Sequence, residues 1–145
     1  MSSVSLYLNF ERCTEEAFLF YKEVFGGEFE GGIARMGDVP TMEGQAPLSD
    51  QDKSLVMHVC LPILNAFKLM GTDAPPSMGF TVTMGNNMFI NLLTDTRTET
   101  DDLFGKLSKG GVVEMPMQVM FWGDYFGSLT DKFGVKWMFN CSEKV

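Results

Sequence analysis

Residues 118–137 read QVMFWGDYFGSLTDKFGVKW, and this stretch decides the fold that the sequence predicts. Two breaks interrupt its apolar pattern, Gly123-Asp124 and Asp131 to Gly134. Both breaks have the glycine and aspartate content of tight turns. We therefore predict that strands at 112–120, 125–130 and 135–141 are joined by these turns.

The pattern that leads into this stretch occurs twice in the chain. Segments 20–27 and 104–111 both begin with Phe and end in Gly-Gly, 84 residues apart. The same offset places the apolar run 6–10 on 90–94. A strand, a helix of matching length and a stop signal all agree at one offset, so the sequence predicts an internal duplication.

Each copy is predicted to be a βαβββ module of an α+β fold. In the first copy Thr14 is the candidate N-cap of a helix that ends at Gly26-Gly27. The other predicted elements of this copy are strands at 5–10, 28–36, 54–62 and 66–71, with a long polar loop at 37–53. The modules then cover about 4–73 and 88–142 of a single 145-residue domain, with a linker at 74–87. Each module has one apolar sheet face to bury. We therefore expect the two to pair into a half-open curved sheet, with the helices outside and a ligand cleft between the modules.

Composition disfavours several classes of function. The net charge of −8 and the isoelectric point near 4.5 argue against binding to nucleic acid or to an anionic membrane, since both need clustered lysine and arginine. No stretch approaches the roughly 20 apolar residues of a membrane span, and the N-terminus lacks the features of a signal peptide. Three widely separated cysteines favour neither a disulfide framework nor a thiolate zinc site. We expect a cytoplasmic protein.

The stretch 118–137 resembles the signature of the PhnB-like family, within the glyoxalase/bleomycin-resistance/dioxygenase (vicinal oxygen chelate) superfamily. Supporting segments are Cys13 to Tyr21, Met57-His58 and Leu69 to Pro76, in the family's order, so the resemblance covers nearly the whole chain. It implies two βαβββ modules per subunit and a homodimer. Family members are often named as demethylubiquinone methyltransferases. This chain has no glycine-rich strand-to-helix turn followed by a ribose-binding acid, so we expect neither methyl transfer nor a cofactor.

The resemblance also indicates where a metal would bind. Catalytic members of the superfamily hold a divalent metal with His, Gln or Glu from the first and last strands of each module. The corresponding positions in this chain fall near Leu6 and Met70, and near Met88 to Ile90 and Met138. Apolar and thioether side chains are poor ligands for magnesium, manganese or zinc, so we expect no metal there.

Seven residues are candidates for contact with a small-molecule ligand: His58, Met70, Phe121, Trp122, Asp124, Tyr125 and Met138. His58, the only histidine, is either a pocket base or a core side chain satisfied by one hydrogen bond. Trp122, Asp124 and Tyr125 either wall a pocket or form a tight turn whose rings cover the core. The sequence assigns no catalytic residue.

Three functions stay open. The first, which the retained fold and missing metal ligands favour, is metal-free binding of a small apolar or mixed molecule in the inter-module cleft. The second is a lyase, isomerase or dioxygenase whose metal site has moved to His58 with Asp73, Asp124 or Glu114. The third is a homodimeric scaffold whose 37–53 loop contacts a protein partner.

Overall fold

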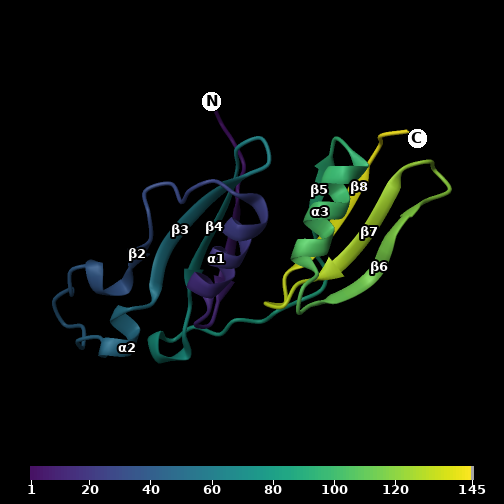
Figure 1. Cartoon of the computed structure of the whole chain (residues 1–145). Coiled ribbons are helices and arrows are strands. Elements are labelled where there is room, and N and C mark those ends of the chain that lie inside the picture. The colour runs from purple at the N-terminus through teal and green to yellow at the C-terminus, as the bar shows by residue number, and fades with distance from the viewer. Residues whose placement is uncertain (145) are drawn as a thin grey trace. The chain divides into compact units, whose positions relative to one another are not determined.

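A computed structural model describes residues 1–144 and divides the chain into two compact units, Met1–Val82 and the residues from Thr83 onward. Each unit contains a four-stranded mixed sheet with a helix packed on it (Figure 1). In each unit the first strand is followed by that helix and then by three further strands. This order confirms the predicted α+β class and the two βαβββ modules. Within residues 1–144, no helix has both the length and the apolar character needed to cross a membrane.

The sheet of the first module has the strand order β1-β4-β3-β2. Strand β1 (Leu6–Phe10) runs parallel to β4 (Phe67–Asp73). Strand β4 pairs antiparallel with β3 (Val56–Ile63), which in turn pairs with the two-residue β2 (Ala34–Arg35). Helix α1 (Thr14–Phe25) crosses one face of this sheet and contacts β3 and β4.

Helix α1 packs closely because its apolar side chains recur at helical spacing. Ala17, Phe18, Tyr21 and Val24 are all buried, which gives the helix one apolar stripe. A Cβ atom added to Gly71 of β4 would lie 2.5 Å from Cε1 of Phe18. The glycine therefore lets the helix approach the sheet, and it identifies the sheet face that α1 covers.

The start of α1 differs from the prediction for Thr14. Cys13 is the N-cap and makes no side-chain capping bond, while Thr14 is the first helical residue. The acceptor comes from Asp73 at the end of β4, whose Oδ1 accepts a hydrogen bond from the Thr14 N–H at 3.0 Å. Its Oδ2 accepts one from the Val56 N–H at 2.8 Å. A buried carboxylate thus supplies the cap, as the positive end of the helix dipole favours.

Strand β2 is much shorter than the strand predicted at 28–36. It contains only Ala34–Arg35. Gly31 and Gly32 have φ angles of 76° and 72°, and this left-handed conformation interrupts an extended strand. The prediction was wrong because it did not treat the glycine pair as a break.

Two segments predicted to be irregular contain short helical turns. The 37–53 loop begins with the 3-10 turn η1 (Met36–Asp38) and ends with the helical turn α2 (Asp50–Lys53). The 74–87 linker contains the 3-10 turn η2 (Pro76–Met78), which ends at Gly79 with a φ of 86°.

The sheet of the second module has the order β5-β8-β7-β6. Strand β5 (Ile90–Thr94) runs parallel to β8 (Lys136–Cys141). Strand β8 pairs antiparallel with β7 (Tyr125–Thr130), and β7 pairs antiparallel with β6 (Val112–Val119). Helix α3 (Arg97–Leu107) contacts β5 and β8. Strands β1 and β5 begin and end 84 residues apart, which confirms the offset of the repeat.

A buried aspartate holds the turn between β7 and β8. Asp131 is only 3% exposed, and its Oδ1 accepts hydrogen bonds from the N–H groups of Phe133 and Val135 at 2.8 and 3.0 Å. Its Oδ2 accepts one from Nε1 of Trp137 at 2.9 Å. Gly134 has a φ of 89°. The structure therefore confirms the predicted turn and shows that its aspartate also fixes the largest buried side chain of the module.

Candidate functional site

We define the open face of each module as the sheet face opposite its helix. In the first module Gly71 lies under α1, so the neighbouring side chain of Met70 lies on the open face. Tyr7 pairs with Met70 in the register of β1 and β4 and shares this face. His58 of β3 lies there too, because its ring contacts that of Tyr7. Two residues predicted from the sequence, His58 and Met70, are thus brought onto one face.

Tyr7 and His58 form a hydrogen-bonded pair on this face. The Tyr7 hydroxyl oxygen lies 2.8 Å from Nδ1 of His58, and the ring centroids are 5.7 Å apart. Burial raises the pKa of the Tyr7 phenol above its usual 10.0, so the phenol keeps its proton at neutral pH. The bond occupies Nδ1, which leaves Nε2 as the ring nitrogen that can reach a ligand. The pair can therefore orient a polar group of a bound molecule.

The sequence prediction missed Tyr7, although a signal for it was present. Leu6, Leu8 and Phe10 alternate with Tyr7 and Asn9, and Phe10 is buried. This period of two places Tyr7 on the face opposite the apolar residues. Position in the alternation, rather than residue type, identifies this residue.

The open face of the second module carries Met138. Phe139 packs edge-on against Phe104 of α3, with ring centroids 5.5 Å apart, so its neighbour Met138 lies on the open face. Asn91 of β5 and Ser128 of β7 are the register partners of Met138 on either side. This part of the face combines a thioether with an amide and a hydroxyl.

A charged cluster lies farther along the same face. Glu114 accepts hydrogen bonds at Oε1 from Nζ of Lys136 at 2.7 Å and from Oγ1 of Thr130 at 2.6 Å. The Lys136 bond, followed by the Thr130 bond, holds the pKa of Glu114 below its usual value. The Lys136 ammonium also lies 5.2 Å from the centroid of the Phe89 ring. Glu114 is thus already paired as a carboxylate.

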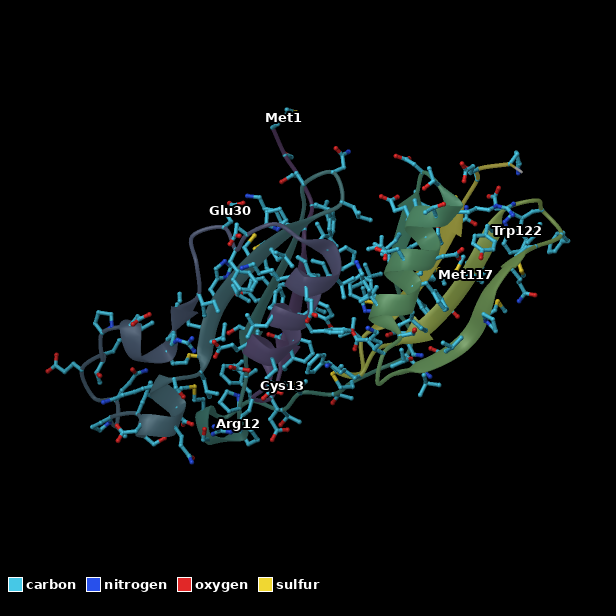
Figure 2. All side chains as sticks on the ribbon, in the orientation of Figure 1. Met1, Arg12, Cys13, Glu30, Met117 and Trp122 are labelled. Carbon is cyan, nitrogen blue, oxygen red and sulfur yellow. The ribbon has the colours of Figure 1, made fainter. Side chains whose placement is uncertain are left out.

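The loop between β6 and β7 carries an aromatic group. Phe121 is 97% exposed and packs edge-on against Trp122, with centroids 5.0 Å apart. Trp122, labelled in Figure 2, also contacts the ring of Phe126 at 5.7 Å. Phe126 is the register partner of Asn140, which lies on the open face by alternation with Met138. One of the two interpretations supposed that the ring of Trp122 covers the core. Trp122 is instead 46% exposed.

Asp124 forms the turn in this loop. Its carbonyl oxygen accepts a hydrogen bond from the Met120 N–H at 2.9 Å, and Gly123 has a φ of 96°. Its side chain accepts a bond from Nδ2 of Asn140 at 2.9 Å, the largest cause of its lowered pKa, and lies 3.3 Å from Nζ of Lys144. Asp124 therefore has a structural role in the turn and also places a carboxylate beside the open face.

Tyr125 lies apart from the other predicted residues. Its register partner is Cys141, and its hydroxyl donates a hydrogen bond to Oδ1 of Asp101 in α3 at 2.6 Å. The guanidinium of Arg97 lies 4.9 Å from the centroid of its ring. Tyr125 thus faces the helix of the second module, on the side opposite Met138.

The structure shows which sheet face the expected metal positions in the first strands occupy. Leu6 pairs with the buried Leu69 on the α1 face, so Tyr7 occupies the open face. In the second module Asn91, the register partner of Met138, takes the corresponding place. These positions offer a phenol and a thioether in the first module, and an amide and a thioether in the second, and neither pair fits a divalent metal well.

A relocated metal site gains little support from the individual carboxylates. Both oxygens of Asp73 accept backbone hydrogen bonds beside α1, and Glu114 and Asp124 are engaged by Lys136 and Asn140. In the described chain, residues 1–144, no group of three or more His, Cys, Asp or Glu side chains is arranged to hold a metal ion.

Comparison with known proteins places the chain among relatives of similar length. The family described as 3-demethylubiquinone-9 3-methyltransferase matches residues 2–139. Protein YjdN of Escherichia coli (strain K12) is 29% identical and the match covers 94% of this chain and 93% of YjdN. The crystal structure of protein PA1353 from Pseudomonas aeruginosa is 34% identical, with a TM-score of 0.82 over 97% of this chain and 98% of that one.

Further structures connect this family to a wider fold. A Bacillus cereus structure described as a putative 3-demethylubiquinone-9 3-methyltransferase, PhnB protein, is 28% identical, with a TM-score of 0.72 over 97% of this chain and 99% of that one. A glyoxylase/bleomycin resistance protein/dioxygenase domain from Frankia sp. EAN1pec is only 12% identical but reaches a TM-score of 0.64, over 99% of this chain and 93% of that one. The likeness to the Frankia domain is therefore a likeness of fold alone.

Proposed function

We propose a binding function for this chain, which belongs to the 3-demethylubiquinone-9 3-methyltransferase family and is a PhnB-like member of the glyoxalase/bleomycin-resistance/dioxygenase superfamily. It binds a small apolar or mixed molecule, without a metal, on the open face of the first module. On the second module, Met138, Trp122 and Asp124 are proposed as ligand contacts of that module's own open face. Methyl transfer is not part of the proposal, because the sequence offers no glycine-rich turn for a nucleotide-derived methyl donor.

The pairing of Tyr7 with His58 is the observation that carries this proposal. A protonated phenol and an imidazole lie at hydrogen-bond distance beside Met70 on the open face of the first module. Ligand sites in proteins combine a mostly apolar lining with a few polar groups that fix orientation. The pair supplies the polar groups, and the flexible thioether of Met70 adapts to apolar parts of a ligand.

Metal addition and ligand binding are expected to affect thermal stability differently. Excess MnCl2, NiCl2 or ZnCl2 should leave the melting temperature unchanged within about 1 °C, because no open-face donor set fits these ions. A compound selected by thermal-shift screening should raise the melting temperature by mass action. At a hundredfold excess over its Kd, it should raise the free energy of unfolding by about 2.7 kcal/mol. Saturable metal-dependent stabilisation would contradict the proposal.

A matched pair of substitutions tests whether such a compound binds the open face. Tyr7→Phe removes one hydroxyl beside His58, so the Kd of the compound should rise by about two- to tenfold. Tyr125→Phe removes the same hydroxyl on the helix side of the second module and should leave the Kd unchanged. Equal effects of the two substitutions in isothermal calorimetry would place the compound elsewhere.

We further propose that the chain forms the homodimer that its family resemblance implies, and that it acts in the cytoplasm. Strand β6 is an edge strand whose Val113 and Val119, the register partners of Leu129 and Tyr125, lie on one face of the sheet and are 42% and 57% exposed, which gives a second copy an apolar surface to cover. Light scattering should then give twice the chain mass of 16.2 kDa. Replacing both valines with lysine should return the mass to that of one chain, whereas a single-chain mass for the unmodified protein would reject the dimer.

A further inference from the structure

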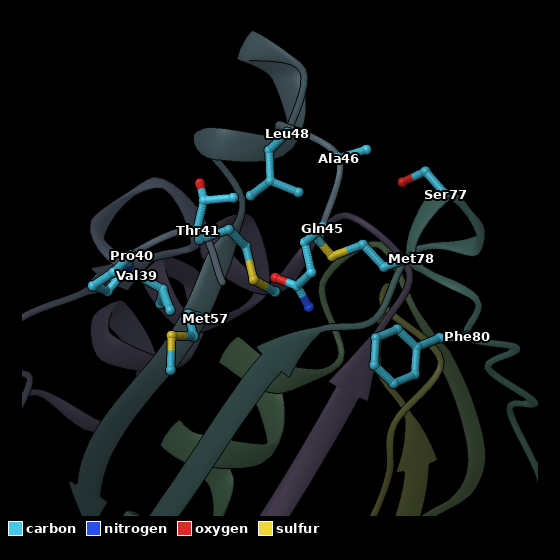
Figure 3. A pocket seen from close by; sticks show the side chains of 11 residues that line it. Val39, Pro40, Thr41, Gln45, Ala46, Leu48, Met57, Ser77, Met78 and Phe80 are labelled. Atoms are coloured by element: carbon cyan, nitrogen blue, oxygen red, sulfur yellow. The ribbon is translucent and has the colours of Figure 1, made fainter. Parts of the chain in front are cut away.

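A cavity lies in the first module, and its lining does not include the Tyr7–His58 pair. Its volume is about 560 Å³, within the range of sites that bind drug-sized molecules, ~300–1,000 Å³. Three segments form its walls: residues 36–48, the start of β3 and residues 77–80 (Figure 3). The residues that line it are Met36, Val39, Pro40, Thr41, Gln45, Ala46, Leu48, Met57, Ser77, Met78 and Phe80.

The lining determines which molecules this cavity can accept. Eight of the side chains are apolar, three are polar and uncharged, and none is ionised at neutral pH. A charged ligand would lose its hydration without gaining a partner of opposite charge, so the cavity disfavours ions. The apolar residues include three methionines and one aromatic residue, Phe80. Thioether sulfur packs favourably against aromatic rings, so this composition selects a planar aromatic molecule.

Gln45 supplies a polar contact. Its Oε1 accepts a hydrogen bond from the Met42 N–H at 3.4 Å, which leaves the Nε2 amide protons to donate. Figure 3 shows the end of this side chain extending into the space between Met57 and Phe80. A ligand with a hydrogen-bond acceptor, such as a carbonyl oxygen, would pair with this amide.

Asp52 links the end of the 37–53 loop to the wall formed by residues 77–80. A guanidinium nitrogen of Arg12 lies 2.7 Å from Oδ1 of Asp52, and the hydroxyl of Ser77 donates to Oδ2 of Asp52 at 2.8 Å. Ser49 Oγ accepts a bond from the Asp52 N–H at 3.1 Å. The Arg12 bond, followed by the Ser77 bond, holds the pKa of Asp52 below its usual value, so the carboxylate stays ionised at neutral pH. This network joins the end of the 37–53 loop to η2, and a preorganised site costs less to order on binding.

We propose that this cavity is a binding site for a neutral aromatic molecule that carries a hydrogen-bond acceptor. The site is distinct from the open face, because neither Tyr7 nor His58 nor Met70 lines it. The proposal does not depend on the open-face function, and either can fail without the other.

Nile red, a neutral aromatic dye with a carbonyl oxygen, provides the test. The full chain should bind it saturably, at one site per chain, with an increase in fluorescence. Met57→Glu places a carboxylate in the cavity and should weaken binding by about tenfold or more, because that charge has no partner there. Met42→Glu is the matched control. Met42 belongs to the 37–53 loop, is 68% exposed and does not line the cavity, so the Kd of the dye should change less than about twofold. Met57 is itself 41% exposed, so neither glutamate should prevent folding.

Two further variants separate this site from the open face. Ala46→Phe fills part of the cavity and should also weaken Nile red binding, while Tyr7→Phe should leave it unchanged. Equal effects of Met57→Glu and Met42→Glu would overturn the assignment, as would a loss of dye binding caused by Tyr7→Phe alone. Absence of saturable binding to the unmodified chain would also overturn it, and would leave the thermal-shift test of the open face unaffected.

Discussion

Asp131→Ala is expected to lower the free energy of unfolding of the second module by about 3 to 5 kcal/mol. The substitution removes the acceptor for two backbone N–H groups and for Nε1 of Trp137, all at a site that is only 3% exposed. Each buried donor left without a partner costs about 1–3 kcal/mol. Trp137 is fully buried, so its indole N–H cannot turn to water without displacing the core.

The measurement is urea denaturation followed by tryptophan fluorescence. Both tryptophans, Trp122 and Trp137, belong to the second module, so the signal reports its unfolding. Asp131→Asn is the graded control: one side-chain oxygen remains to accept the backbone bonds, and about half of the loss is expected. A loss below about 1 kcal/mol for Asp131→Ala would show that water replaces the carboxylate.

The repeat made the architecture predictable from the sequence. The offset of 84 residues placed β5 from β1, and the Gly-Gly pairs located the ends of both helices to within three residues. These signals are local, because a helix stop and a period-two strand depend on residues close in the chain. The cap of α1 was not predictable in this way. Asp73, which accepts the Thr14 N–H, is 59 residues away.

The candidate site was harder to predict because strands alternate with a period of two. An alignment based on the helices selected Leu6 and the region from Met88 to Ile90, whereas Tyr7 and Asn91 are the residues that pair with Met70 and Met138 on the open faces. A slip of one residue exchanges the two faces of a sheet. Residue type identified His58 and the alignment identified Met70, whereas Tyr7 is identified by its position in the alternation of β1.

The cavity under the 37–53 loop shows a different limit. The sequence marked this loop as a contact for a protein partner on length alone. Its other walls come from Met57 in β3 and from residues 77–80 in the linker, two segments that no short-range pattern connects to the loop. The hydrogen bond of Ser77 to Asp52 spans 25 residues, so only the folded chain reveals that residues 77–80 are held to the end of the loop.

Gly111→Ala is expected to destabilise the second module by about 3 kcal/mol, measured by the same denaturation experiment. A Cβ atom on Gly111 would overlap the carbonyl oxygen of Thr130 and lie 2.9 Å from the Cα and carbonyl carbon of Asp131. These are backbone atoms of the β7–β8 hairpin, so the contact cannot be relieved by rotating a side chain. Overpacking of this kind costs about 1–3 kcal/mol, and the rigid backbone places the expected value at the upper end.

Gly105→Ala is the matched control, and its effect on the free energy of unfolding is expected to have the opposite sign. Gly105 lies in α3, and a Cβ atom there would meet nothing within 4 Å. Replacing an exposed helical glycine by alanine should stabilise the module by about 0.5 to 1 kcal/mol, because the unfolded chain then loses less conformational freedom on folding. The same chemical change should thus have opposite effects at two positions six residues apart. Equal effects would mean that the end of α3 shifts to accommodate the methyl group, and that the close approach of Gly111 to the hairpin is not required by the fold.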